Sequence, residues 1–205
     1  MARLPAKRSA ARAGLLSLLL LSCGHFFVDL YSSALGALQP LLLERFGLTL
    51  TDAGILGGLL VTSSSVMQPL YGYLSDRFHT RLFAALGPAI AGLFISSLGL
   101  APGHGWLRAM VWLGGAGIAS LPPQASARTA LETAGERRAS AMAIFISAGT
   151  LGLALGPTYF SLVSASFGLS RTFWAAVPGL TVSALLIWLL PAGSKPTLKN
   201  RASDW

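Results

Sequence analysis

The chain has 205 residues, of which 53% are apolar and only 11% are charged. A soluble domain carries about 25% charged residues, so this composition leaves too little charge to cover a water-exposed surface. The net charge of +8 would suit nucleic acid, but the basic residues form no stripe interleaved with aromatic residues. The single Cys23 excludes an internal disulfide and a multi-cysteine metal site. The composition therefore predicts a membrane protein with no cofactor, no metal site and no nucleic-acid partner.

The apolar residues form six blocks of about 20 residues, the length that crosses a hydrocarbon core of about 30 Å at about 1.5 Å per helical residue. We therefore predict an all-α membrane protein whose six transmembrane helices form one bundle over residues 14–191. The predicted helices cover residues 14–39, 52–74, 82–101, 106–125, 141–165 and 172–191. The linkers between them are short and leave no room for a soluble catalytic domain.

The distribution of Lys and Arg predicts the orientation of these helices. If the basic N-terminus, residues 1–13, is cytoplasmic, twelve of the 15 basic residues lie inside and only Arg45, Arg108 and Arg171 lie outside. The tail, residues 192–205, is rich in polar residues and is expected to be disordered and also cytoplasmic. We expect a multi-pass protein of the cell (inner) membrane.

The first block also imitates a secretory signal with a lipidation site at Cys23. The apolar stretch continues past Cys23 to Pro40, which is too long for a signal core and favours a membrane span.

The first predicted helix carries two ionisable residues, His25 and Asp29. Counted from Gly14, they lie about 16 Å and about 22 Å into the membrane. They are four residues apart and hence neighbours on one helix face. An ionisable side chain at this depth normally faces a cavity or a partner. One interpretation is a proton-titrating pair that lines a substrate path. The alternative is a pair that satisfies itself as a contact between helices.

The face that carries this pair continues along the first predicted helix at steps of three and four residues. Its other members are Ser22, Ser32, Gly36 and Gln39. We predict that Ser22, Ser32 and Gln39 line the substrate path with the pair. Tyr31 lies off this stripe, and we include it as a path candidate with simple packing as the alternative.

Two later helices carry regularly spaced small residues, which mark close helix contacts in lipid. In the second helix these are Gly54, Gly58, Val61, Ser65, Gln68 and Gly72, and in the fifth Ala148, Gly152 and Gly156, followed by Pro157. Close packing is the favoured interpretation of both runs, and Gln68 is also a path candidate. Pro122 and Pro123 should break the fourth helix near its cytoplasmic end. Gln124 follows as a candidate at the mouth of the path, although an ordinary helix end explains it equally well.

The segment from Gly72 to Arg81 resembles the loop pattern G-x-x-x-D-R-x-G-R-R of the major facilitator superfamily, which lies between the second and third helices. The matching residues are Gly72, Asp76, Arg77 and Arg81, and the resemblance implies that they form a cytoplasmic gate. The run Gly152-x-x-x-Gly156-Pro157 resembles the glycine-proline motif of antiporters in that superfamily.

Within the superfamily, the chain most resembles the fosmidomycin resistance group of drug efflux proteins, through His25-x-x-x-Asp29-x-Tyr31, Pro40-Leu41-Leu42 and other runs across the first five helices. The resemblance implies a secondary transporter with two six-helix halves, each a three-plus-three inverted repeat, of which this chain supplies one half. It also implies proton-coupled efflux of small amphipathic compounds by alternating access.

The second half would come from a homodimer or from a separate chain. We favour the homodimer, because an isolated half would expose the polar face of the first helix to lipid. The alternatives are a membrane scaffold that transports nothing and a truncated fragment of a 12-helix transporter. A membrane-embedded enzyme has little support, since the sequence shows neither a zinc cluster nor a nucleophile beside a base.

Overall fold

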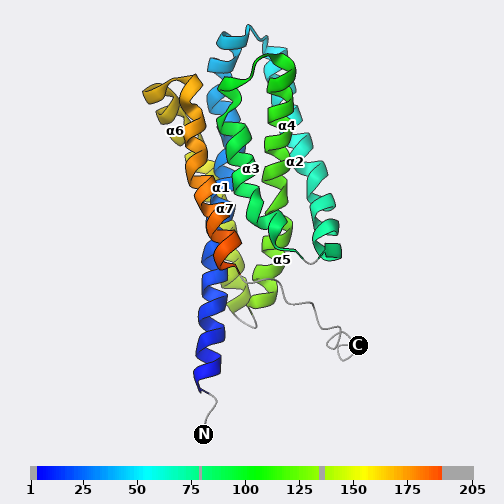
Figure 1. Ribbon diagram of the computed structural model, residues 1–205, viewed down its shortest axis with the longest axis vertical. Coiled ribbons are helices and arrows are strands. Elements are labelled where there is room, and N and C mark those ends of the chain that lie inside the picture. The colour runs from blue at the N-terminus through cyan, green and yellow to red at the C-terminus, as the bar shows by residue number, and fades with distance from the viewer. Residues whose placement is uncertain (1–3, 79, 134–136, 191–205) are drawn as a thin grey trace.

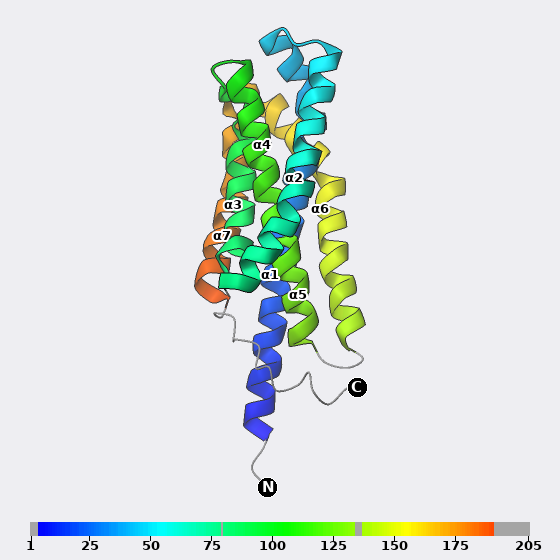
Figure 2. The same cartoon turned by 90° about the vertical axis from the view of Figure 1, so that its right-hand side faces the viewer.

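The computed structural model describes residues 4–78, 80–133 and 137–190, and these residues form helices and turns without any strand. The α-helices are α1 (Leu4–Phe46), α2 (Leu50–Phe78), α3 (Leu82–Ser96), α4 (His104–Ser120), α5 (Pro122–Glu132), α6 (Arg137–Phe167) and α7 (Val177–Leu189). Two 3-10 helices, η1 (Leu98–Leu100) and η2 (Leu169–Ala176), precede α4 and α7. Consecutive long helices run in opposite directions, so α5 and the start of α6 lie near the N-terminal end of the bundle (Figures 1 and 2).

Four helical segments are long and apolar enough to cross a membrane: residues 13–46, 50–78, 137–167 and 169–189. The third helix, α3, is a shorter apolar helix, and α4 has 17 residues. Both α3 and α4 run alongside the long helices (Figure 2), and α4 packs between α2 and α3. The prediction of an all-helical membrane protein is confirmed.

The first helix is longer than predicted. It begins at Leu4, so residues 4–13 of the expected basic N-terminus belong to α1. It also continues past Pro40 to Phe46, because a proline inside a helix removes one backbone hydrogen bond without ending the helix. The predicted disordered tail, residues 192–205, lies outside the described residues.

Two other prolines mark helix starts. The predicted break in the fourth span is present, since α4 ends at Ser120 and α5 begins with Pro122. Proline suits the first turn of a helix, where the backbone N–H it lacks would have no partner in the helix. In the same way Pro178 lies in the first turn of α7, and the predicted helix 172–191 therefore begins as the 3-10 helix η2.

The most extensive helix contact joins α1 to α6, and glycines of α6 make it close. A Cβ atom at Gly152 would overlap the carbonyl oxygen of Phe26, and one at Gly156 would overlap that of Leu30. The backbones of the two helices therefore touch, as the small-residue run suggests. Pro157, the next residue of this motif, is exposed.

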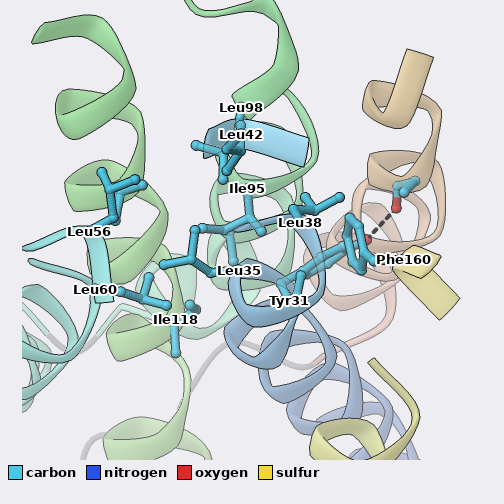
Figure 3. Close-up of a cluster of buried hydrophobic side chains, with 14 of the residues drawn as sticks. Tyr31, Leu35, Leu38, Leu42, Leu56, Leu60, Ile95, Leu98, Ile118 and Phe160 are labelled. Carbon is cyan, nitrogen blue, oxygen red and sulfur yellow. Dashed lines mark hydrogen bonds between the residues drawn. The ribbon is translucent and has the colours of Figure 1, made fainter. Parts of the chain in front are cut away.

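Tyr31 connects α1 to α3 and α7 (Figure 3). Its side chain is fully buried, its hydroxyl donates a hydrogen bond to the carbonyl of Ala175 (2.9 Å) and it accepts one from the N–H of Gly179 (3.0 Å). Glycines make room for the ring, since a Cβ atom at Gly92 would lie 2.9 Å from the Cζ atom of Tyr31. Buried leucines of α1, together with Ile95 of α3, continue this core along the bundle (Figure 3).

The α1–α6 contact yields a stability prediction. We expect Gly152→Ala to lower the thermal unfolding temperature in detergent, because overpacking of this kind costs about 1–3 kcal/mol. Gly54→Ala is the matched control, since its Cβ atom would meet nothing within 4 Å. It should leave the unfolding temperature unchanged or slightly higher, because alanine favours a helix over glycine by about 1 kcal/mol. Equal losses in both variants would contradict the close contact.

Candidate functional site

The two ionisable residues predicted on the first helix form a pair in the structure. Nε2 of His25 lies 3.4 Å from Oδ2 of Asp29, and the side chains are 14% and 25% exposed, respectively. The other ring nitrogen, Nδ1 of His25, lies 2.9 Å from the carbonyl oxygen of Phe145 on α6. The imidazole also stacks on the Phe145 ring, with 4.3 Å between the ring centroids. The pair is therefore held from both α1 and α6.

Gly149 provides the space that the pair occupies. A Cβ atom at this position would lie 2.5 Å from Oδ2 of Asp29 and 2.5 Å from Cε1 of His25. Sequence reasoning included neither Phe145 nor Gly149 in the site. The spacing of Gly149, Gly152 and Gly156 on one face of α6 was the available signal, since Gly149 extends the small-residue run by one turn.

The pair is separate from the other charges of the described residues. Another ion pair joins Arg108 and Asp52 near the start of α2, with 3.2 Å between Nη2 and Oδ1. Within this described part, no three His, Cys, Asp or Glu side chains come together as metal ligands. The arrangement can bind and release protons, and its neighbours are apolar or carry no charge.

Two other residues of the predicted polar stripe make hydrogen bonds to backbone carbonyls of helices. Ser32 donates to the carbonyl of Asp29 in its own helix (2.9 Å), and Gln39 donates to the carbonyl of Ala53 on α2 (3.0 Å). Ser22 is buried, and its hydroxyl has no hydrogen-bond partner in the part of the chain that the structure describes. Tyr31 lies inside the bundle with both hydrogen-bonding roles of its hydroxyl filled, which fits the packing role given as its alternative.

The small-residue face of α2 is uncovered. Its members Gly54, Gly58, Val61, Ser65 and Gln68 are all exposed, and at both glycines the space beyond the backbone is open to 4 Å. The close helix contact predicted for this face is therefore not made within the described residues. A surface of this kind fits a helix that comes from outside them.

Beside this face, an open groove of about 440 Å³ lies between α2, α5 and α6. Its lining residues are Gln68, Pro69, Gly72, Pro122, Pro123, Ser126 and Phe145. Phe145 thus lines the groove, and its ring stacks on His25. Gln68, a predicted path residue, belongs to this groove.

The residues of the predicted gate lie at the N-terminal end of the bundle and differ in their exposure and contacts. Asp76 and Arg77 are exposed near the end of α2, and neither makes an ion pair or hydrogen bond with the described residues. Arg81 donates to the carbonyl of Leu190 at the end of α7, where a cation is favoured by the helix dipole. Gly72 faces Pro123 at an ordinary contact distance, 4.0 Å from a Cβ built on it.

Gln124 joins α5 to the α2–α3 turn. Its Oε1 accepts from the N–H of Ala84 (2.9 Å), and its Nε2 donates to the hydroxyl of Ser75 (2.5 Å) and to the carbonyl of Thr80. The acceptor and both donors of the amide are therefore bonded to other parts of the bundle. These bonds favour the alternative of an ordinary helix end, and the role at the path mouth stays a prediction.

Sequence reasoning missed a polar cluster at the opposite end. Asp52 accepts from the N–H (3.1 Å) and from the hydroxyl (2.7 Å) of Thr49, and the Thr49 hydroxyl accepts from the N–H of Asp52. This reciprocal cap at the start of α2 has the Thr-x-x-Asp spacing that announces a helix start in sequence. Arg108 then links the cap to α4.

The apolar helices and the isolated polar pair define a multi-pass membrane protein. The sequence model of the Major Facilitator Superfamily matches residues 21–204, and the chain belongs to this superfamily. It is 28% identical to the fosmidomycin resistance protein of Escherichia coli (strain K12), over 81% of this chain and 41% of that protein. It is 29% identical to YfnC, an uncharacterized MFS-type transporter of Bacillus subtilis (strain 168), over 84% of this chain and 41% of that protein.

A more distant similarity is to protein spinster homolog 1 of Homo sapiens, at 27% identity over 75% of this chain and 29% of that protein. The chain thus spans about two fifths or less of the length of these curated relatives. The resemblance to the superfamily and to its fosmidomycin resistance group is confirmed.

The contacts of Gln124 predict a stabilising role. We expect Gln124→Ala to destabilise the protein by about 1–3 kcal/mol, because it leaves three partly buried partners of the amide without their hydrogen bonds. The measurement is unfolding in detergent with increasing denaturant. Gln68→Ala, which removes an exposed amide, is the matched control and should change stability little. A path residue without a structural role would behave like the control, and that result would contradict the role assigned to Gln124.

Proposed function

We propose that the chain is a six-span half of a secondary transporter that exports small amphipathic compounds in exchange for protons by alternating access. The observation that carries this proposal is the His25–Asp29 pair, which lies within an apolar helix, partly exposed and away from other charges. An ionisable pair within a membrane span costs free energy, so such pairs are rare and usually mark a functional site. The printed name of the Escherichia coli relative, a fosmidomycin resistance protein, supports export of drug-like compounds.

In this proposal the groove between α2, α5 and α6 belongs to the substrate path. Three prolines and Phe145 give it an apolar lining, and Gln68 and Ser126 add uncharged polar groups. Such a lining suits a compound with both apolar and hydrogen-bonding parts. Since Phe145 also stacks on His25, a bound compound would lie one ring away from the proton site.

The gate of this transporter would include Asp76 and Arg77, whose exposed side chains are free to meet a second half. The excess of basic residues on one side supports a cytoplasmic location for both ends in the cell (inner) membrane. The proposal also takes the six spans as two inverted repeats of three.

We propose that a second copy of this chain supplies the other half. The uncovered face of α2 and the partly exposed pair would both face lipid in a single copy. A two-fold axis along the membrane normal would use the same face twice and bury it in both copies. The alternative is that a separate second chain of similar fold covers the face of α2 and the pair.

Transport can be tested in liposomes with a pH-sensitive dye inside and a panel of small amphipathic drugs, fosmidomycin among them, outside. We expect drug-driven proton movement in the unaltered protein and its loss in Asp29→Asn, which keeps the shape but cannot titrate. Asp52→Asn removes a carboxylate from the opposite end and should retain the movement. No signal in the unaltered protein, or an equal signal in Asp29→Asn, would show that the proposed coupling is wrong. A scaffold would give no signal in any variant.

The proposed pairing can be tested by cysteine cross-linking. In a Cys23→Ser background, we expect Ser65→Cys on the exposed face of α2 to form a cross-linked dimer in membranes. Leu93→Cys, on an exposed position of α3, is the matched control and should stay monomeric, because α3 lies outside the proposed interface. Equal cross-linking at both positions would indicate random collision, and its absence at Ser65 would exclude this symmetric pairing.

A further inference from the structure

We propose that α6 determines how the His25–Asp29 pair holds protons. The carbonyl of Phe145 fixes His25 with its proton on Nδ1, and the bare backbone at Gly149 keeps Asp29 beside Nε2. The two side chains then share one further proton. This inference deepens the proposed function, because it assigns the positioning residues of the coupling site.

The carbonyl of Phe145 determines which ring nitrogen of His25 carries the proton. A carbonyl oxygen only accepts hydrogen bonds, so the 2.9 Å contact between it and Nδ1 of His25 requires the proton to be on Nδ1. A neutral imidazole carries one N–H, and the hydrogen bond made by one nitrogen determines the state of the other. When His25 is neutral, Nε2 therefore presents a lone pair.

Asp29 lies on the other side of the imidazole ring, beside Nε2. Nε2 of His25 and Oδ2 of Asp29 are 3.4 Å apart. Without a proton between them, a lone pair would face a carboxylate, and the two would repel. With one proton, the pair is either imidazolium with carboxylate or imidazole with carboxylic acid, and both forms have zero net charge and attract. The 3.4 Å separation of the two atoms fits this one-proton state, in which they attract.

The geometry of the pair is provided by α6, and α1 alone does not provide it. Residues four apart on a helix are neighbours, but nothing in α1 fixes the rotation of the imidazole. On α6, the Phe145 ring stacks on the imidazole at an angle of 17° between the planes. A side chain at 149 would displace both members, since its Cβ atom would lie 2.5 Å from Asp29 and 2.7 Å from Nδ1 of His25. Phe145 and Gly149 are therefore positioning residues.

No other ionisable group takes part within the described residues. The helices α3 and α7 contain no charged residue, those of α2, α4 and α6 lie toward helix ends, and α5 carries Arg128 and Glu132. Neither member of the pair makes an ion pair or a hydrogen bond with any of them. The ionisable residues of the elements packed against α1 are Asp52, Tyr71, Tyr73, Asp76, Arg77, His104, Arg108, Arg128, Glu132, Arg137, Arg138 and Tyr159.

The test is nitrogen NMR of the full chain, labelled at histidine and held in lipid nanodiscs. The chain has three histidines, so His79→Gln and His104→Gln leave His25 as the one observed ring. Across a pH titration we expect Nδ1 to stay protonated throughout and Nε2 to show one transition. Asp29→Asn should move the midpoint of that transition. A neutral ring protonated on Nε2, or an unmoved midpoint, would overturn the inference.

Two variants separate positioning from general stability. We expect Gly149→Ala to lose the preference for the Nδ1 proton, while Thr150→Ala, an exposed neighbour on α6, should keep it. Phe145→Leu keeps the backbone carbonyl and should also keep the Nδ1 proton. If Gly149→Ala does not fold, the spectra of the unaltered protein and of Phe145→Leu decide the question. A proton on Nε2 in Phe145→Leu would contradict the role of the carbonyl.

The NMR result does not depend on transport. A protein with the Nδ1 proton and no drug-driven proton movement would exclude the proposed function and keep this inference. A transporting protein with the Nε2 proton would do the reverse.

Discussion

The contact between α1 and α6 is the constraint on which the rest of the structure depends. In lipid, apolar surface gains nothing by leaving one hydrocarbon surrounding for another, so helices associate through close packing and hydrogen bonds. Glycines at 149, 152 and 156 let α6 lie directly on the backbone of α1. The same closeness brings the carbonyl of Phe145 to His25, so the packing of the bundle and the geometry of the polar pair have one cause.

The polar groups of the bundle divide by whether they have partners. Tyr31, Gln39 and Gln124 spend their hydrogen bonds on backbone groups of neighbouring elements, and an unpaired polar group in this setting would cost several kcal/mol. The small face of α2 and the groove beside it have no such cover. The side chains with hydrogen-bond partners hold the bundle together. The uncovered face of α2 and the groove are the surfaces for which we propose a partner and a substrate.

The sequence predicted what depends on local pattern. Apolar block length predicted the helices, the double proline predicted the break before α5, and four-residue spacing predicted the His25–Asp29 pair. It could not predict how each helix is turned toward its neighbours, which is why Tyr31 and Gln124 were placed on a path. The α2 run shows the same limit, because small residues mark a contact without naming the partner. The carbonyl of Phe145 left no signal, since every residue has a backbone carbonyl.

The burial of Tyr31 has a mechanical consequence. Asp29 and Tyr31 are two residues apart, about 200° around the helix, so α6 and the α3–α7 side grip α1 from nearly opposite directions. A helix clamped in this way cannot roll about its own axis. Rotation of α1 in response to a change of charge at the polar pair would therefore have to break contacts on both sides of the helix.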